Sequence, residues 1–149
     1  MNICVDSGFL YSLYEPRETK RHQIAVDTFY KYIDPKQASN KLIIIWPILY
    51  EVINTRFIKR YIIEFDQLLL HLERRELLEF ADDKYYRDNC LFATRSCSNS
   101  DWDLSLVDRV IREALKDTQL KIDALLTFNP GDFSDICIKR KLRQLCQEN

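Results

Sequence analysis

Glycine is the residue that this sequence most lacks, since Gly8 and Gly131 are the only two among 149 residues. Phosphate-binding loops of the G-x-G-x-x-G or Walker type need several glycines close together, because the backbone must approach the phosphates. The sequence therefore excludes nucleotide binding through either motif. The same scarcity counts against a flavodoxin-like domain for a small phospho-ligand, which is one of the function classes compatible with the chain's size.

Long hydrophobic runs and an excess of one charge are also missing. The longest apolar stretch, 42–50, contains Pro47 and is far shorter than the roughly 20 residues that span a membrane. With 22 Lys and Arg against 23 Asp and Glu, the formal net charge is −1, which excludes a globally basic nucleic-acid-binding protein. No secretory signal pattern begins the chain, so we expect a cytoplasmic protein without a membrane partner.

The five cysteines form no C-x-x-C pair and are odd in number, which favours unpaired thiols in a reducing compartment. The only histidines, His22 and His71, fall in segments with helical periodicity, so we expect no Cys–His or Ser–His–Asp catalytic device.

Short β-type runs alternate with amphipathic segments of helical length. The pattern predicts strands over 2–6, 42–46, 77–81 and 123–128, helices over 7–14, 21–33, 47–57, 61–74, 82–93 and 106–115, a loop over 94–101, a turn over 129–132 and a final short strand in the tail 136–149. The unbroken apolar run 42–46 is typical of a parallel strand buried on both faces. We therefore predict one domain over 1–149, an α/β/α three-layer sandwich with a mostly parallel central sheet.

Oxygen-bearing side chains follow several of these predicted strands. Asp6 ends the first strand, Glu51 lies about one turn into the helix after the second, and Asp108 lies in the first turn of a later helix. Asn129 and Asp132 follow the last clear strand. Ligands of open parallel sheets bind beyond the carboxyl ends of the strands, where these oxygens would suit a hard divalent cation. This arrangement is typical of a metal-dependent phosphodiesterase.

Four segments stand in order at these positions: Ile3 to Leu10 (ICVDSGFL), Trp46 to Ile53 (WPILYEVI), Leu104 to Ile111 (LSLVDRVI) and Ala124 to Asn129 (ALLTFN). Through them, nearly the whole chain resembles the PIN-domain ribonucleases, especially the VapC-type toxins of toxin–antitoxin pairs. The resemblance implies an endoribonuclease that hydrolyses RNA phosphodiester bonds. Its catalytic acids would be Asp6, Glu51 and Asp108, holding Mg²⁺ or Mn²⁺.

The chain departs from that family where a fourth acid is common, since Asn129 stands there. Asp132 and Asp103 are nearby carboxylates that would replace it in part. The departure leaves open an alternative, a catalytically weak PIN-like module that binds RNA or a protein without hydrolysis. In either case Thr127 is expected to orient a water or a phosphate.

The resemblance also implies partners: an RNA substrate, a small antitoxin protein and a second copy of the chain, for which the apolar segment 61–72 offers a surface. An acidic site needs cations near it to hold a polyanion. The candidate stretches are 17–21, 56–60 and 139–143, and Arg56 is the preferred phosphate ligand because it follows Glu51 on the predicted helix.

Each candidate acid also has a plain structural interpretation. Asp6 is a good helix cap, and Glu51 is a favourable charge near a helix N-terminus. Ser105 and Asp108 have the spacing of a capping box, and the segment 129–132 is an ordinary turn. The convergence of separate elements on one sheet edge is what favours a functional site.

Overall fold

A single all-parallel sheet organises the structure, a computed structural model that describes residues 1–17, 19–33, 39–96 and 104–146. Within these residues the strands are β1 (Asn2–Val5), β2 (Lys41–Ile45), β3 (Leu78–Ala81), β4 (Ala124–Leu126) and β5 (Arg143–Leu145). They lie in the order β3-β2-β1-β4-β5, and every neighbouring pair is parallel. The predicted α/β class is confirmed.

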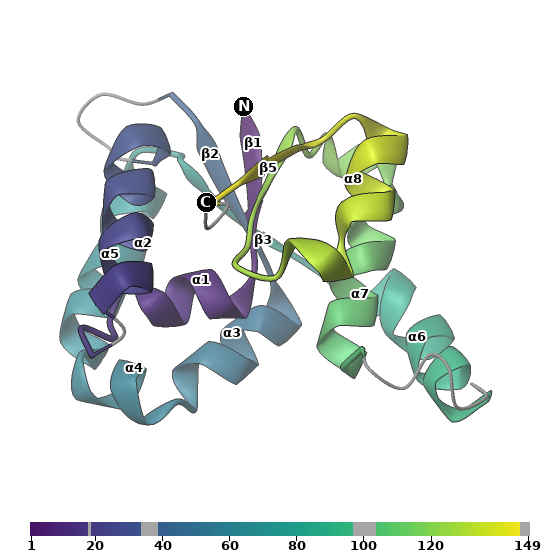
Figure 1. Cartoon of the computed structure of the whole chain (residues 1–149), viewed down its shortest axis with the longest axis horizontal. Helices are drawn as coiled ribbons and strands as arrows, with labels where there is room; N and C mark the ends of the chain where they lie inside the picture. The colour runs from purple at the N-terminus through teal and green to yellow at the C-terminus, as the bar shows by residue number, and fades with distance from the viewer. Residues whose placement is uncertain (18, 34–38, 97–103, 147–149) are drawn as a thin grey trace.

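Helices cover both faces of this sheet (Figure 1). On one side lie α1 (Ser7–Ser12), α2 (Thr19–Tyr32), α3 (Trp46–Ile53), α4 (Arg56–Arg60) and α5 (Ile62–Arg74), and on the other α6 (Lys84–Ser96), α7 (Leu106–Lys116) and α8 (Ser134–Arg140). The arrangement confirms the predicted three-layer sandwich. No helix in the described ranges has the length and apolar character needed to cross a membrane.

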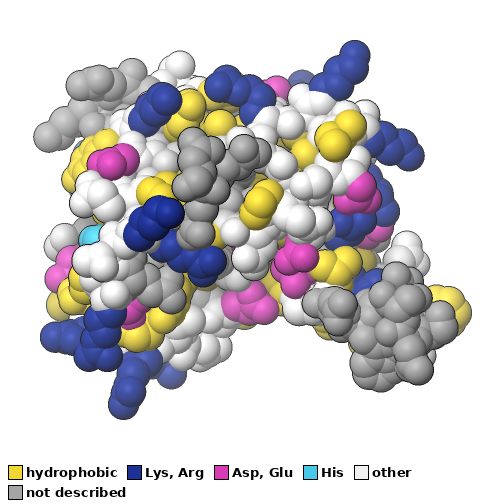
Figure 2. Space-filling model, in the orientation of Figure 1, with side chains coloured by type: hydrophobic (Ala, Val, Ile, Leu, Met, Phe, Trp, Pro, Cys, Tyr) yellow, Lys and Arg dark blue, Asp and Glu magenta, His cyan; other side chains and the backbone are white. Residues whose placement is uncertain are grey.

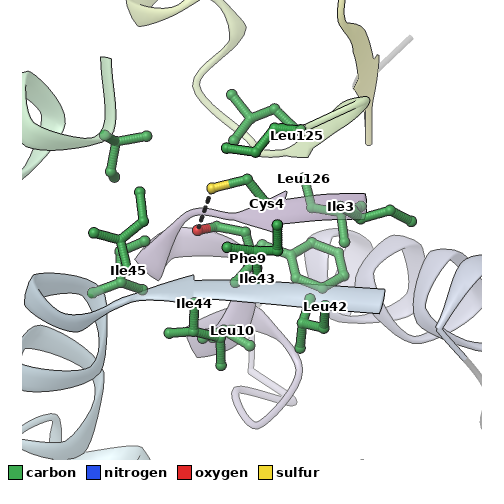
Figure 3. Close-up of a cluster of buried hydrophobic side chains, with 14 of the residues drawn as sticks. Ile3, Cys4, Phe9, Leu10, Leu42, Ile43, Ile44, Ile45, Leu125 and Leu126 are labelled. Carbon is green, nitrogen blue, oxygen red and sulfur yellow. Dashed lines mark hydrogen bonds between the residues drawn. The ribbon is translucent and has the colours of Figure 1, made fainter. Parts of the chain in front are cut away.

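The central strands are buried on both faces, as their unbroken apolar sequences predict. Figure 3 shows the side chains of β1, β2 and β4 packed with Phe9 and Leu10 of α1. Cys4 belongs to this core, where burial raises the pKa of its thiol to about 12, so it behaves as a small hydrophobic residue. The four described cysteines are all free and buried; Cys97 lies outside the described residues.

The order of the strands reverses at β1. From β1 the chain adds β2 and then β3 on one side, and afterwards returns to add β4 and β5 on the other. The carboxyl ends of β1 and β4 therefore flank the switch point, where ligands of open α/β sheets bind. This point is where the chain places Asp6 and the segment after β4.

Two segments differ from the sequence-based prediction. The tail contains α8 before β5, whereas the sequence predicted a strand alone; two helical turns are too short for a clear periodic signal. The segment predicted as a loop over 94–101 is helical as far as Ser96, where α6 ends, and the rest of it lies outside the described residues.

The helix predicted over 47–57 is broken into α3 and α4. The Thr55 hydroxyl donates to the carbonyl of Val52 (2.8 Å) and accepts from the amide of Ile58 (3.3 Å), so it caps the start of α4. Such a local side-chain bond competes with a continuous helix. Arg56 consequently does not share a helix with Glu51, and that part of the prediction is wrong.

We expect Thr55→Ala to lower the free energy of unfolding by about 1 kcal/mol, because the amide of Ile58 loses its cap. Urea denaturation measures the change. Thr55→Ser keeps the hydroxyl and should remain within a few tenths of a kcal/mol of wild type. Equal stability of the Ala and Ser variants would show that the cap does not hold α4.

Candidate functional site

Asp6 is a buried carboxylate at the carboxyl end of the central strand, with a relative exposure of 3%. Oδ2 accepts a hydrogen bond from the Thr127 hydroxyl (3.0 Å) and Oδ1 accepts one from the Ser7 hydroxyl (3.3 Å). The residue occupies the N-cap position of α1, but its side chain makes no capping bond. The helix-cap interpretation therefore does not account for this carboxylate.

The environment of Asp6 disfavours its charge. Burial raises the pKa of the carboxyl, the Thr127 and Ser7 hydrogen bonds lower it, and the charge of Asp108 raises it further. Among the described residues, the partners of Asp6 include no lysine or arginine. A buried carboxylate beside a second carboxylate is a place where a cation would be stabilising.

Thr127 fixes the orientation of Asp6. Its side chain is buried, and its hydroxyl accepts from the amide of Asn129 (2.9 Å) while donating to Asp6. The sequence predicted contact with a water or phosphate; the structure directs this hydroxyl at Asp6. Thr127 is thus a positioning residue that connects the ends of β1 and β4.

Asp108 makes the capping box that its spacing from Ser105 predicted. Its Oδ2 accepts from the amide of Ser105 (3.1 Å), and its own amide donates to the Ser105 hydroxyl (3.0 Å). This structural role does not remove Asp108 from the site, because the half-buried carboxylate still acts on the pKa of Asp6. The cap fixes the carboxylate at the N-terminal turn of α7.

Glu51 is exposed on α3 and lines a cleft of about 250 Å³. The other lining residues are Ser7, Gly8, Tyr11, Val52 and Thr55. The cleft therefore brings Glu51 to the residues that directly follow Asp6. Figure 2 shows acidic side chains near the middle of this face, over the region where Figure 1 places α3 and the loop after β4.

The loop after β4 holds the remaining oxygen candidates. The Asn129 side chain is exposed, and the short 3₁₀ turn Pro130–Asp132 follows it, with the Asp132 amide bonded to the Asn129 carbonyl (3.2 Å). The turn interpretation is thus confirmed, while Asp132 is half-buried. Asp103 lies outside the described residues.

Arg112 holds this loop against α7, a contact that no sequence motif predicts. The guanidinium bonds both carboxylate oxygens of Asp135 on α8 (2.9 and 2.8 Å) and also donates to the Asp132 carbonyl. Arg112 lies one turn after Asp108 on α7. It therefore fixes the loop that carries Asn129 relative to the helix that carries Asp108.

The basic stretches differ in what they contact. Arg56 is exposed on α4, where Figure 2 shows Lys and Arg side chains gathered at the lower left of this face. Arg140, in the third stretch, donates to the carbonyls of Leu115 (3.0 Å) and Lys116 at the end of α7. The structural interpretation therefore holds for Arg140, while Arg56, Lys59 and Arg60 of α4 are exposed.

The oxygen atoms of these side chains are suitable ligands for a hard cation, although they do not surround one completely. Within the described ranges, no three Asp, Glu, His or Cys side chains lie close enough together to form a metal-binding group. Mg²⁺ in proteins usually keeps several waters and binds one or two carboxylates plus substrate phosphates. Asp6 and Asp108 are two such carboxylates, and the charge of Asp108 raises the pKa of Asp6.

In comparisons with models of protein families and with curated protein sequences, the chain matches none of them.

We expect Asp6→Asn to raise the melting temperature above neutral pH. The folded-state pKa of Asp6 is raised, so ionisation destabilises the fold as pH rises from the unfolded value of about 3.9 through the folded value. In a chain of this size each kcal/mol relieved raises the melting temperature by roughly 2–4 °C. The difference in melting temperature between Asp6→Asn and the wild type should vanish near pH 4 and below. Thermal unfolding at a series of pH values measures it.

Asp27→Asn, an exposed substitution on α2, is the matched control and should show no such dependence on pH. A fall in melting temperature of Asp6→Asn at pH 8 would mean that the ionised carboxylate stabilises the fold.

Proposed function

We propose that this chain is a metal-dependent endoribonuclease of PIN type, in which Asp6 and Asp108 hold Mg²⁺ or Mn²⁺ and Glu51 borders the substrate cleft. The observation that carries the proposal is the Asp6 carboxylate. It is buried at the switch point of the sheet, caps no helix, has no cationic partner among the described residues and lies near a second carboxylate.

A purely structural role would leave this carboxylate unexplained. Burying a charge without a counter-charge is destabilising, and a neutral side chain of similar shape would accept the same bond from Thr127. Carboxyl groups with perturbed pKa values cluster at functional sites, which makes Asp6 a candidate. A bound cation would offset the cost of burying the charge of Asp6.

A bound Mg²⁺ or Mn²⁺ would supply the charge that activates a water and stabilises the scissile phosphate. The protein itself would orient the two carboxylates that bind the ion. Thr127 holds Asp6 and the capping box holds Asp108, so neither carboxylate needs reordering when it binds. Exposed cations on α4, including Arg56, would contact RNA phosphates and position the strand without reading its sequence.

The same proposal includes a cytoplasmic toxin whose acidic cleft is covered by a small antitoxin. This element comes from the resemblance of the four sequence segments to VapC-type toxins.

The second candidate, an RNA- or protein-binding module without hydrolysis, is favoured by Asn129. An amide at that position brings no charge, and the described residues contain no group of three metal-binding side chains. Weak metal affinity would then leave a domain that binds but does not cut.

We expect the wild type to cleave a labelled mixture of single-stranded RNAs with Mn²⁺, and EDTA to abolish cleavage. Asp6→Asn and Asp108→Asn should lower the rate by more than about 100-fold, since loss of a mere positioning partner of a metal ligand costs about 10–100-fold. Asparagine at 108 can still accept from the Ser105 amide, so the fold should persist. Asp27→Asn should cut like wild type.

Metal binding gives a readout that does not need activity. Mn²⁺ should raise the melting temperature of the wild type and of Asp27→Asn but not of Asp6→Asn, because a ligand of the folded state stabilises it. If folded wild type binds RNA in EDTA and cuts nothing, the binding module is the correct function.

The expected homodimer has a surface on α3 and α5. Exposed apolar side chains gather there on Ile53, Ile62 and Ile63, around a groove of about 300 Å³. We expect Ile63→Glu to convert dimers into monomers in sedimentation experiments, because a charge in an apolar contact is costly. Ile138→Glu, equally exposed but on α8, should leave the dimer intact; a monomeric wild type would refute the expectation.

A further inference from the structure

The cleft between α1 and α3 has the size and lining of a pocket for one flat ring. Its volume is about 250 Å³, somewhat below the roughly 300–1,000 Å³ of sites that hold whole small molecules. Its wall is mostly apolar, and its lining also includes Ser7, which directly follows Asp6, and Glu51. A phosphate bound by a metal ion at Asp6 would have this mostly apolar cleft beside it, because Ser7 of the cleft directly follows Asp6.

Gly8 is the feature of this cleft that packing does not explain. It lies inside α1 without a positive φ, so its backbone conformation does not require glycine. A Cβ added there would meet only Asp6 Oδ2, at 3.6 Å, which is an ordinary contact. Glycine weakens a helix relative to alanine, and this chain has only two glycines. The missing side chain leaves open space beside the Asp6 carboxylate, where Gly8 lines the cleft.

Tyr11 adds an aromatic wall to that space. It lies three residues after Gly8 on α1, which places both on one helix face. The ring of Phe57 packs edge-on against it, with centroids 5.0 Å apart and planes at 90°, so the tyrosine ring is fixed in orientation. Fixed aromatic side chains beside phosphate-binding groups are the usual platforms for single-stranded nucleic-acid bases.

We propose that this cleft binds one nucleotide base, next to a phosphate bound by the metal ion at Asp6. Tyr11 forms the aromatic wall of the cleft, and Gly8 leaves room for the base because it has no side chain. The identity of the ligand rests on the proposed ribonuclease function. The pocket itself is a feature of α1 and α3.

Binding of three small probes tests the proposal without any cleavage. Adenosine 5′-monophosphate and uridine 5′-monophosphate carry a base, whereas ribose 5-phosphate is the matched probe that lacks one. With Mg²⁺ present, ligand-detected NMR should show at least one nucleotide binding about fivefold or more tightly than ribose 5-phosphate, the least that one stacked base contributes.

Gly8→Ala should reduce nucleotide affinity to that of ribose 5-phosphate while its melting temperature stays equal to or above that of wild type. Tyr11→Phe should bind like wild type, and Tyr11→Leu should lose the preference for nucleotides. Loss of affinity in a variant of undiminished stability separates an occupied pocket from damaged packing.

Equal binding of nucleotides and ribose 5-phosphate by the wild type, no detectable binding of either nucleotide, or an unaffected Gly8→Ala variant would each overturn the proposal. If the wild type cuts RNA but shows one of these results, the proposed base pocket is refuted and the proposed ribonuclease function is supported. If the wild type cuts no RNA but binds nucleotides as expected, the proposed hydrolysis is refuted and the proposed base pocket is supported.

Discussion

A carboxylate buried at the end of the central strand is the constraint around which the site is arranged. β1 pairs with β2 on one side and with β4 on the other, so Asp6 follows the strand at which the order of the strands reverses. Hydroxyl groups, not cations, hold it there. The consequence is a carboxylate whose orientation is fixed by hydrogen bonds and whose charge has no cationic partner among the described residues.

The same side chains stabilise the fold and lie at the candidate site. Asp108 caps α7 and acts on the charge of Asp6, while Arg112 ties α8 and the loop after β4 to the same helix. A structural role for a candidate residue is therefore not an argument against a functional one. Asp6 differs from the others because burial disfavours its charge, as its raised pKa shows, and because its side chain caps no helix.

Much of this could be predicted from the sequence, for identifiable reasons. The unbroken run 42–46 and Pro47 define a buried strand followed by a helix, and the structure has both. The break at Thr55 and the helix α8 were missed, because one side-chain bond and two helical turns leave no periodic signal. The cleft beside Gly8 could not be foreseen, since it depends on how α1 packs against a helix about forty residues away.

The bond between Thr127 and Asp6 joins residues 121 positions apart in the chain. Contacts of such long range form late, because the entropy of closing the intervening loop must be overcome first. During synthesis, β1 leaves the ribosome long before β4 exists, so a nascent chain carries Asp6 without the strand that orients it. The contact between Asp6 and Thr127 therefore cannot form until synthesis has passed Thr127.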